Sequence, residues 1–494
     1  MSTITELKPR KPQGVSALFF IQIFATLGFA VLYSTLVIYA TKKLGFSAKE
    51  ATAIMGVFGA FNYGLHLFGG YLGGRFMSNR NLFVGGMAFQ ALGCGIMASG
   101  GAEAMYWGLG LFLTGSGLNV TCINMMLTQR FKPEDERREG AFLWNYAGMN
   151  LGFFIGFSVA GHYQLSQDYS SLFMFASVGN FIAIILAILN WRRINDLTTP
   201  LMSVSASVFK QRFAIGVVIM VALVPLIYMM LHHAELTGNL VLIISVFIFM
   251  VLVFLTLKHQ DKREQKNMSA YIVLWLGSLV FWTLYQMAPM GLQLFAVNNI
   301  DRMVWGVEIA PQWIQNINSV VVTLGGPMMA ALFVAMRARG MKVNIPAQFT
   351  AALALIGVAF LLLPVGIKLA DGNGMVAFKW IFASYVLQSI GELLISPIGY
   401  AMIGKLAPAK YQGVMMGTWM LGTGTASVVA SFFSGLIPEA QEGSAALTNP
   451  TYDHIFSMLG WGGVGMAVIL LILIPFLRKL ISDKEETAPI AQAA

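Results

Sequence analysis

A single carboxylate, Glu392, stands in the apolar stretch QSIGELLISPIGYAM, residues 388–402. No Lys, Arg or Asp lies between Lys379 and Lys405. A carboxylate near the middle of a membrane costs roughly 2.5–3.5 kcal/mol on insertion scales. It avoids that cost by taking up a proton or by pairing with a cation, because desolvation disfavours its unpaired charge. Glu392 is therefore a candidate for binding a proton or an amine, and the alternative is a structural glutamate held by hydrogen bonds.

Helical spacing gives Glu392 polar neighbours. Residues at i, i+3 and i+4 lie on one face of a helix, and on this face they are Tyr385, Gln388, Ser389, Ser396 and Gly399. Pro397 predicts a bend beside the glutamate. The other face consists of Leu, Ile and Val, so the polar face is expected to point toward protein or water rather than lipid.

Other apolar segments carry similar polar stripes. They contain Gln22, Thr26, Tyr33, Asn62, Tyr63, His66, Ser116, Asn119, Asn124, Asn145, Tyr146, Asn150, Trp282, Tyr285, Gln286, Gln293, Gln315, Asn318 and Trp419. Any one of them fits the structural role that Asn and Gln often play between membrane helices. His66 fits either a neutral structural histidine or a proton carrier. Together the stripes predict one central polar cavity, lined by aromatic side chains, for a small polar organic substrate.

The composition requires that these residues be positioned by membrane helices. Of the 494 residues, 57% are hydrophobic and 11% charged, against about 25% charged in a soluble domain. Fourteen apolar runs are long enough to cross a bilayer as helices. They cover roughly residues 15–40, 50–74, 82–100, 104–128, 140–163, 171–191, 213–231, 238–257, 269–298, 311–336, 346–367, 376–404, 411–437 and 457–477. The fold class expected is an all-α integral membrane protein with 14 transmembrane helices.

Lys and Arg set the orientation. With the N-terminus inside, only six of the 31 basic residues lie outside, and these are Lys42, Lys43, Lys49, Arg302, Lys368 and Lys379. Both termini are therefore expected in the cytoplasm. The basic residues are scattered at helix ends, so the net charge of +9 does not indicate a nucleic-acid partner.

Basic loops on both flanks mark the seventh and eighth spans as an insert between two sets of six. Two six-helix bundles indicate the major facilitator fold, which transports by alternating access. GGYLGGRFMSNR, residues 69–80, resembles the loop motif of that superfamily, with Gly74 where Asp is usual. The expected domains are a cytoplasmic tail (1–14), an N-terminal bundle (15–193), a linker with the insert (194–267), a C-terminal bundle (268–478) and a second tail (479–494). No phosphate loop, metal-ligand spacing or nucleophile motif is visible, so no enzyme, cofactor or metal is expected.

Several motifs together resemble one family. NYAGMNLG, residues 145–152, resembles its signature FYxxINxG, with Asn145 in place of Phe. FNYGLHLFGGYLGGR resembles its second core helix, and FAVNNIDR (295–302) and WIQNINSVVV (313–322) resemble the end of its seventh and the start of its eighth. The Glu392 stretch resembles the helix of the family that carries a glutamate. On these motifs the whole chain resembles the proton-dependent oligopeptide transporters, a branch of the major facilitator superfamily.

The resemblance implies roles for individual residues. Glu392 would bind a substrate amino group and titrate, with His66 as a second proton-coupling candidate. Asn318 and Asn150 would hydrogen-bond the substrate backbone. The pocket would be lined by Tyr33, Tyr63, Tyr146, Tyr285 and Trp419, and Gln315 joins the substrate-binding set from its place on the stripe of Asn318.

The chain departs from the family at the expected cations. Gln22, Ala25 and Thr26 stand where the first helix usually carries ExxER, and Val120 replaces a lysine of the fourth. A desolvated carboxylate needs charged or multiple donors. A compound with an amine but no free α-carboxylate therefore fits better than an ordinary dipeptide.

The function expected is secondary active transport, by a monomer in the inner membrane, of di- or tripeptides or peptide-like amine-bearing compounds, coupled to protons. Two alternatives stay open. One is a carrier of carboxylate-lacking metabolites, siderophore-like or drug-like, without the usual proton coupling. The other is a transport-inactive ligand sensor, which the missing coupling residues favour.

Overall fold

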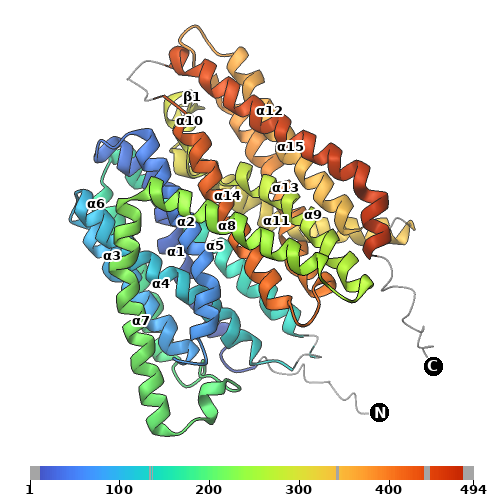
Figure 1. Ribbon diagram of the computed structural model, residues 1–494. Helices are drawn as coiled ribbons and strands as arrows, with labels where there is room; N and C mark the ends of the chain where they lie inside the picture. Colours follow the sequence, from blue (N-terminus) through green and yellow to red (C-terminus); the bar gives the residue numbers. More distant parts are fainter. Residues whose placement is uncertain (1–11, 133–134, 136, 341–343, 439–444, 482–494) are drawn as a thin grey trace, which may run out of the picture. The chain divides into compact units, whose positions relative to one another are not determined.

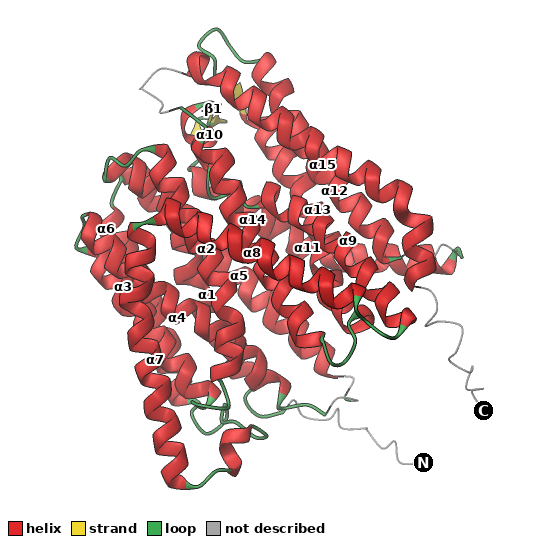
Figure 2. Ribbon diagram, viewed as in Figure 1, coloured by secondary structure: helices red, strands yellow, loops and turns green. Residues whose placement is uncertain are grey.

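A computed structural model describes residues 12–132, 135, 137–340, 344–438 and 445–481 of the chain. Most of the predicted tails 1–14 and 479–494 lie outside these residues. In the described part helices dominate and strands are two residues long (Figures 1 and 2). The helices are α1 (Val15–Ile38), α2 (Ala48–Leu72), α3 (Asn79–Ala98), α4 (Ala102–Thr128), α5 (Arg137–Ser166), α6 (Tyr169–Leu189), α7 (Ala206–His232), α8 (Ala234–Leu257), α9 (Lys262–Tyr285), α10 (Gly291–Asn298), α11 (Pro311–Ala338), α12 (Ile345–Lys368), α13 (Phe378–Leu406), α14 (Gln412–Gly435) and α15 (Ala445–Ile481).

All of these helices except α10 have at least 20 residues, which gives the fourteen long helices expected. Within the described residues, twelve of the helices are long and apolar enough to cross a membrane. The helices α5 and α14 are not among these twelve. Polar side chains account for that: α5 carries Asn145 and Asn150, and α14 is rich in Gly, Ser and Thr. The all-α membrane fold is confirmed.

Two predicted spans have different bounds in the structure. The run 269–298 is interrupted, because α9 ends at Tyr285 and α10 begins at Gly291. Pro289 lies in the break, where its missing N–H and its ring prevent a continuous helix. The last span was predicted to start at residue 457, but it belongs to a helix that begins at Ala445. Pro450 lies in the second turn of this helix and does not interrupt it.

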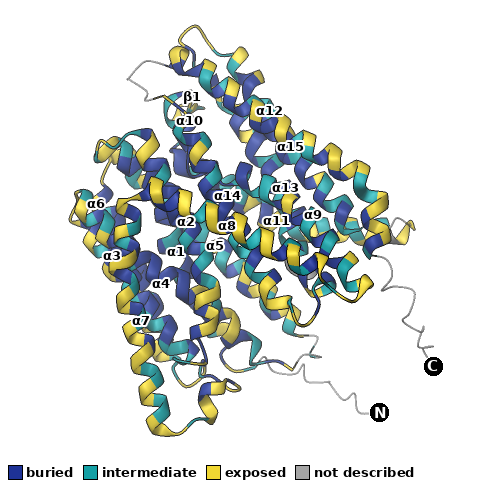
Figure 3. Ribbon diagram, viewed as in Figure 1, coloured by how far each residue is buried: buried dark blue, intermediate teal, exposed yellow. Residues whose placement is uncertain are grey.

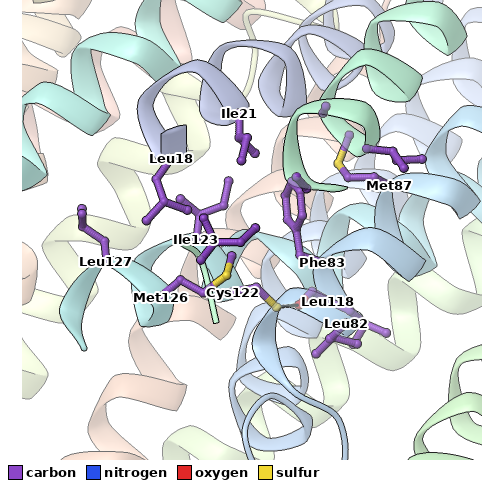
Figure 4. Close-up of a cluster of buried hydrophobic side chains, with 14 of the residues drawn as sticks. Leu18, Ile21, Leu82, Phe83, Met87, Leu118, Cys122, Ile123, Met126 and Leu127 are labelled. Carbon is purple, nitrogen blue, oxygen red and sulfur yellow. Dashed lines mark hydrogen bonds between the residues drawn. The ribbon is translucent and has the colours of Figure 1, made fainter. Parts of the chain in front are cut away.

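The chain divides into two compact units. Unit 1 consists of residues 1–30, 65–156 and 170–228, and unit 2 of residues 31–64, 157–169 and 229–494. The predicted bundles 15–193 and 268–478 stay a prediction. In unit 1 an apolar core joins α1, α3 and α4 through buried side chains that include Leu18, Phe83 and Cys122 (Figure 4).

Close packing of α5 on α1 brings polar groups of unit 1 together. A Cβ at Gly152 would lie 2.5 Å from the carbonyl oxygen of Ile23. Only a glycine allows the two backbones to approach so closely. Asn145, two turns earlier in α5, is consequently within reach of Gln22.

Unit 2 combines α8 to α15 with four short strands at the ends of helices. β1 (Ile300–Asp301) pairs in parallel with β4 (Val376–Ala377), with Ile300 opposite Val376. β2 (Met303–Val304) pairs antiparallel with β3 (Val307–Glu308). The parallel pair ties the segment after α10 to the start of α13, the helix that carries Glu392.

Gly399 controls the packing of α13 on α14. A Cβ at this position would lie 2.1 Å from Cζ2 of Trp419, whose ring is 4% exposed. We expect Gly399→Ala to lower the free energy of unfolding by about 1–3 kcal/mol, because a buried indole cannot move away without strain. Gly404→Ala in the same helix is the matched control, since a Cβ there meets nothing within 4 Å. Thermal unfolding in detergent compares the two, and equal midpoints would contradict the prediction.

Asp261 begins α9, the helix that carries Tyr285. Its side chain accepts hydrogen bonds from the backbone N–H groups of Arg263 and Glu264, and these bonds lower the pKa of the Asp261 carboxyl. The stabilisation is therefore complete above the unfolded pKa of about 3.9 and is lost as the pH falls through the lower folded pKa.

We expect Asp261→Ala to lower the unfolding midpoint at pH 7 and to differ less from wild type near pH 3. Asp261→Asn, which keeps an acceptor that does not titrate, should change less with pH than wild type. Thermal unfolding at both pH values measures this. A deficit in Asp261→Ala that is equal at both values would mean that the charge of Asp261 is irrelevant.

Candidate functional site

Three helices of unit 2 meet at Glu392. Tyr285 of α9 donates its hydroxyl to Oε2 of Glu392 at 2.8 Å, and Asn318 of α11 donates Nδ2 to the same oxygen at 2.6 Å. Asn318 Nδ2 also donates to Oγ of Ser389, one turn before the glutamate in α13, at 3.1 Å. Glu392 is half-buried. The structure thus brings together three of the residues predicted from sequence.

Both donors converge on one oxygen of the carboxylate. Within the described part of the chain, Oε1 of Glu392 accepts no hydrogen bond. A carboxylate can accept about four hydrogen bonds through its two oxygens. The protein therefore orients the group through Oε2 and leaves Oε1 as an acceptor for another molecule. A substrate ammonium suits this acceptor, because charge-assisted hydrogen bonds are the strong ones.

A second hydrogen-bonded set lies next to Tyr285 in the sequence. Tyr33 donates its hydroxyl to Oε1 of Gln286 at 3.3 Å, and Nε2 of Gln286 donates to the hydroxyl oxygen of Tyr63 at 3.4 Å. Gln286 is buried and is the residue that follows the end of α9. The side-chain amide of Gln286 thus binds both Tyr33 and Tyr63, which were predicted to line the pocket. The preceding residue, Tyr285, binds Glu392.

Gln315 and Trp419 have partners of their own. Gln315 donates Nε2 to Oε1 of Gln293 at 2.8 Å, and Gln293 donates Nε2 to the carbonyl oxygen of Ser34 at 2.9 Å. Trp419 packs against Phe349, edge to face, with ring centroids 6.4 Å apart. A role of either residue in substrate binding stays a prediction.

Unit 1 holds the residues that replace the expected charged motif, and they form a neutral cluster. Gln22 donates Nε2 to Oγ1 of Thr26 at 2.9 Å, and Thr26 donates its hydroxyl to the carbonyl oxygen of Gln22. Asn145 donates Nδ2 to Oε1 of Gln22 at 3.3 Å. Thr26 and Asn145 are buried. None of the three side chains is charged, whereas the ExxER motif of the family has three charged residues in this part of the first helix.

The remaining predicted site residues also belong to unit 1. Asn150 is buried and donates Nδ2 to the carbonyl oxygen of Tyr146, whose side chain is exposed. His66 is half-buried in α2. Whether these three join Glu392 in one site stays a prediction.

The pairing of Asn145 with Gln22 is the feature that sequence reasoning missed. The signal was present, because Asn145 stands at a signature position that is usually Phe, and it coincides with the loss of charge at Gln22 and Thr26. An amide in place of an aromatic ring supplies the donor that a neutral Gln22 needs.

The helices and the hydrogen-bonded carboxylate define a multi-pass α-helical membrane protein with a polar site built from several spans. The model of the POT family matches residues 77–449, which is most of the chain. The chain therefore belongs to the POT family, a family of transporters, and the resemblance found in its motifs is confirmed.

Relatives match over nearly the full length. Dipeptide and tripeptide permease A of Chromobacterium violaceum is 30% identical, over 99% of this chain and 98% of the relative. The protein of the same name from Cronobacter turicensis is 28% identical, over 98% and 97%.

Solved structures support the fold. A peptide transporter POT in complex with sulfate matches with a TM-score of 0.83 at 24% identity, over 95% of this chain and 96% of that one. A POT family transporter in complex with 5-aminolevulinic acid matches with a TM-score of 0.81 at 21% identity, over 94% and 96%.

Proposed function

We propose that the protein is a secondary active transporter that moves small peptides or peptide-like amine-bearing compounds across the inner membrane by alternating access. Glu392 binds the substrate amino group in this proposal. The observation that carries it is the arrangement of Glu392, whose Oε2 accepts from Tyr285 and Asn318 while Oε1 is left for a ligand. The names of the permease relatives support peptides as the substrate class.

The neutral cluster of Gln22, Thr26 and Asn145 favours a substrate without a free α-carboxylate. Its three hydrogen bonds are internal or to the backbone, and no cation among them offers a desolvated carboxylate the charged donors it needs. This favours peptide amides and other amine-bearing compounds over ordinary dipeptides.

The remaining parts of the proposal come from the sequence and the family. Proton coupling is typical of the family, and Glu392 and His66 are its candidates here. The distribution of Lys and Arg supports both termini in the cytoplasm. We further propose a monomer that carries out no enzymatic reaction.

An assay in liposomes tests the function. Purified protein is reconstituted, an inward proton gradient is imposed, and the internal pH is followed while alanyl-alanine or its amide is added. We expect acidification with the amide and a weaker response, or none, with the free dipeptide. An equal response to both would contradict the preference for a substrate that lacks the carboxylate.

Silence with both compounds leads to a second measurement on the same vesicles. Exchange of radiolabelled peptide amide, without a proton gradient, separates uncoupled transport from a sensor that only binds. Exchange would support transport without the usual coupling. Its absence, together with binding of the amide to the detergent-solubilised protein, would replace the proposed transporter with a ligand sensor.

A further inference from the structure

Two arginines of unit 1 lie side by side where α7 passes the loop between α2 and α3. Arg75 belongs to that loop, and Arg212 lies in the second turn of α7. Nη1 of Arg212 donates to the carbonyl oxygen of Arg75 at 3.4 Å. The contact is close because a Cβ at Gly216 would lie only 2.6 Å from Cγ of Met77 in the same loop.

No carboxylate of the described residues pairs with these cations. Ion pairs in that part of the chain, such as Lys49 with Glu235 and Arg302 with Glu308, involve other residues. Asp196 lies close to the end of this loop, but it is buried and accepts from the backbone N–H and the side-chain amide of Asn79. Neighbouring like charges repel one another, so the pair of Arg75 and Arg212 is suited to an anion.

Aromatic and apolar side chains adjoin the cations. The guanidinium of Arg75 lies over the ring of Tyr71, 4.8 Å from its centroid, and Tyr71 is 51% exposed. An arginine stacked in this way keeps N–H donors at the edge of its plane. Tyrosine is enriched where a membrane protein meets the lipid headgroups.

The surface of α7 beyond the cations is apolar. Exposed positions run along it over several turns (Figure 3). They include Ile215, Val217, Val218 and Val221. Only 28% of the most apolar stretch of α7 is buried within the protein. A span with so little of its surface covered by protein presents that surface to acyl chains.

We propose that Arg75 and Arg212 bind the phosphate headgroup of an anionic phospholipid whose acyl chains lie along the exposed face of α7. Guanidinium groups match phosphate oxygens in geometry and charge. Basic pockets beside membrane helices bind anionic headgroups for the same reason. The apolar face of α7 indicates that the phosphate belongs to a membrane lipid, because a free phosphate has no acyl chain to contact that face.

Lipid binding to the purified protein tests this without any transport step. Native mass spectrometry measures retained phosphatidylglycerol and phosphatidylcholine. We expect wild type to prefer phosphatidylglycerol. Arg75→Gln combined with Arg212→Gln should weaken its binding on the order of twentyfold, since each basic residue near an anionic surface contributes about fivefold. The control combines Lys132→Gln with Arg192→Gln, which removes two exposed cations elsewhere in unit 1 and should change little.

A second variant separates lost charge from lost fold. Arg75→Lys with Arg212→Lys keeps both charges and should keep most of the preference. Equal retention of both lipids by wild type, or equal losses in the glutamine and control pairs, would overturn the proposal. So would displacement of phosphatidylglycerol by millimolar inorganic phosphate or glycerol phosphate, because a soluble anion would then be the ligand.

Discussion

Glu392→Gln is expected to reduce transport strongly while leaving the fold intact. The amide oxygen of glutamine can still accept from Tyr285 and Asn318, so the hydrogen bonds that orient the side chain survive. The amide nitrogen then takes the place of Oε1 and presents a donor to the substrate ammonium. Removing one partner of a buried charge pair costs about 2–5 kcal/mol. The initial rate of uptake, with the compound that wild type transports in liposomes, should fall on the order of 100-fold.

The control for Glu392→Gln is Glu139→Gln, the same chemical change at an exposed position in the first turn of α5. It should transport like wild type, and thermal unfolding should be similar for all three proteins. Undiminished uptake by Glu392→Gln would assign the glutamate a structural role and remove the amine site from the proposed function. A large loss of stability in that variant would contradict the claim that its hydrogen bonds are preserved.

Thr26→Arg, which restores the cation of the family motif, should destabilise the protein when made alone. Thr26 is 7% exposed and bonded to Gln22 within a neutral cluster. A buried charge without a partner costs about 3–5 kcal/mol. Adding Gln22→Glu supplies a carboxylate one turn away and should recover most of that loss. Thermal unfolding of the two variants measures the difference.

Thr26→Met is the matched control for bulk. It fills similar space without a charge and should lose only about 1 kcal/mol, the usual value of one hydrogen bond. Thr26→Arg as stable as Thr26→Met would mean that water or lipid headgroups reach this position. If the pair Gln22→Glu and Thr26→Arg is stable, adding Val120→Lys tests recognition, and unchanged affinity for alanyl-alanine would refute the argument from missing cations.

The fold was largely predictable because its physics is local. An apolar run of 20 residues identifies a membrane helix without knowledge of its neighbours, so the number of long helices followed from the sequence. The break between Tyr285 and Gly291 was missed because the run stays apolar through Pro289. The early start of α15 was missed for the opposite reason, since its first turns carry polar residues such as Asn449.

The site was only partly predictable because its contacts run between helices. Spacing placed Glu392 and Ser389 on one face of their helix, and the family motif pointed to Asn318. Nothing in the sequence of α9 indicates that Tyr285 donates to Glu392 whereas the next residue, Gln286, bonds to Tyr33 and Tyr63. Which of these two side chains meets which partner depends on how each helix is rotated about its axis, and the packing of the helices sets that rotation.

The polar character of α5 and α14 has a consequence for biogenesis. Each emerges from the ribosome as a segment that falls short of the apolar helices around it, yet the fold requires both to cross the bilayer. We therefore expect α1 to stay near the translocon until α5 emerges, because the Asn145–Gln22 hydrogen bond between them gives α5 a polar partner. For α14 the waiting partner is α13, whose Gly399 receives the indole of Trp419. We thus expect these helices to insert as pairs rather than by independent partitioning steps.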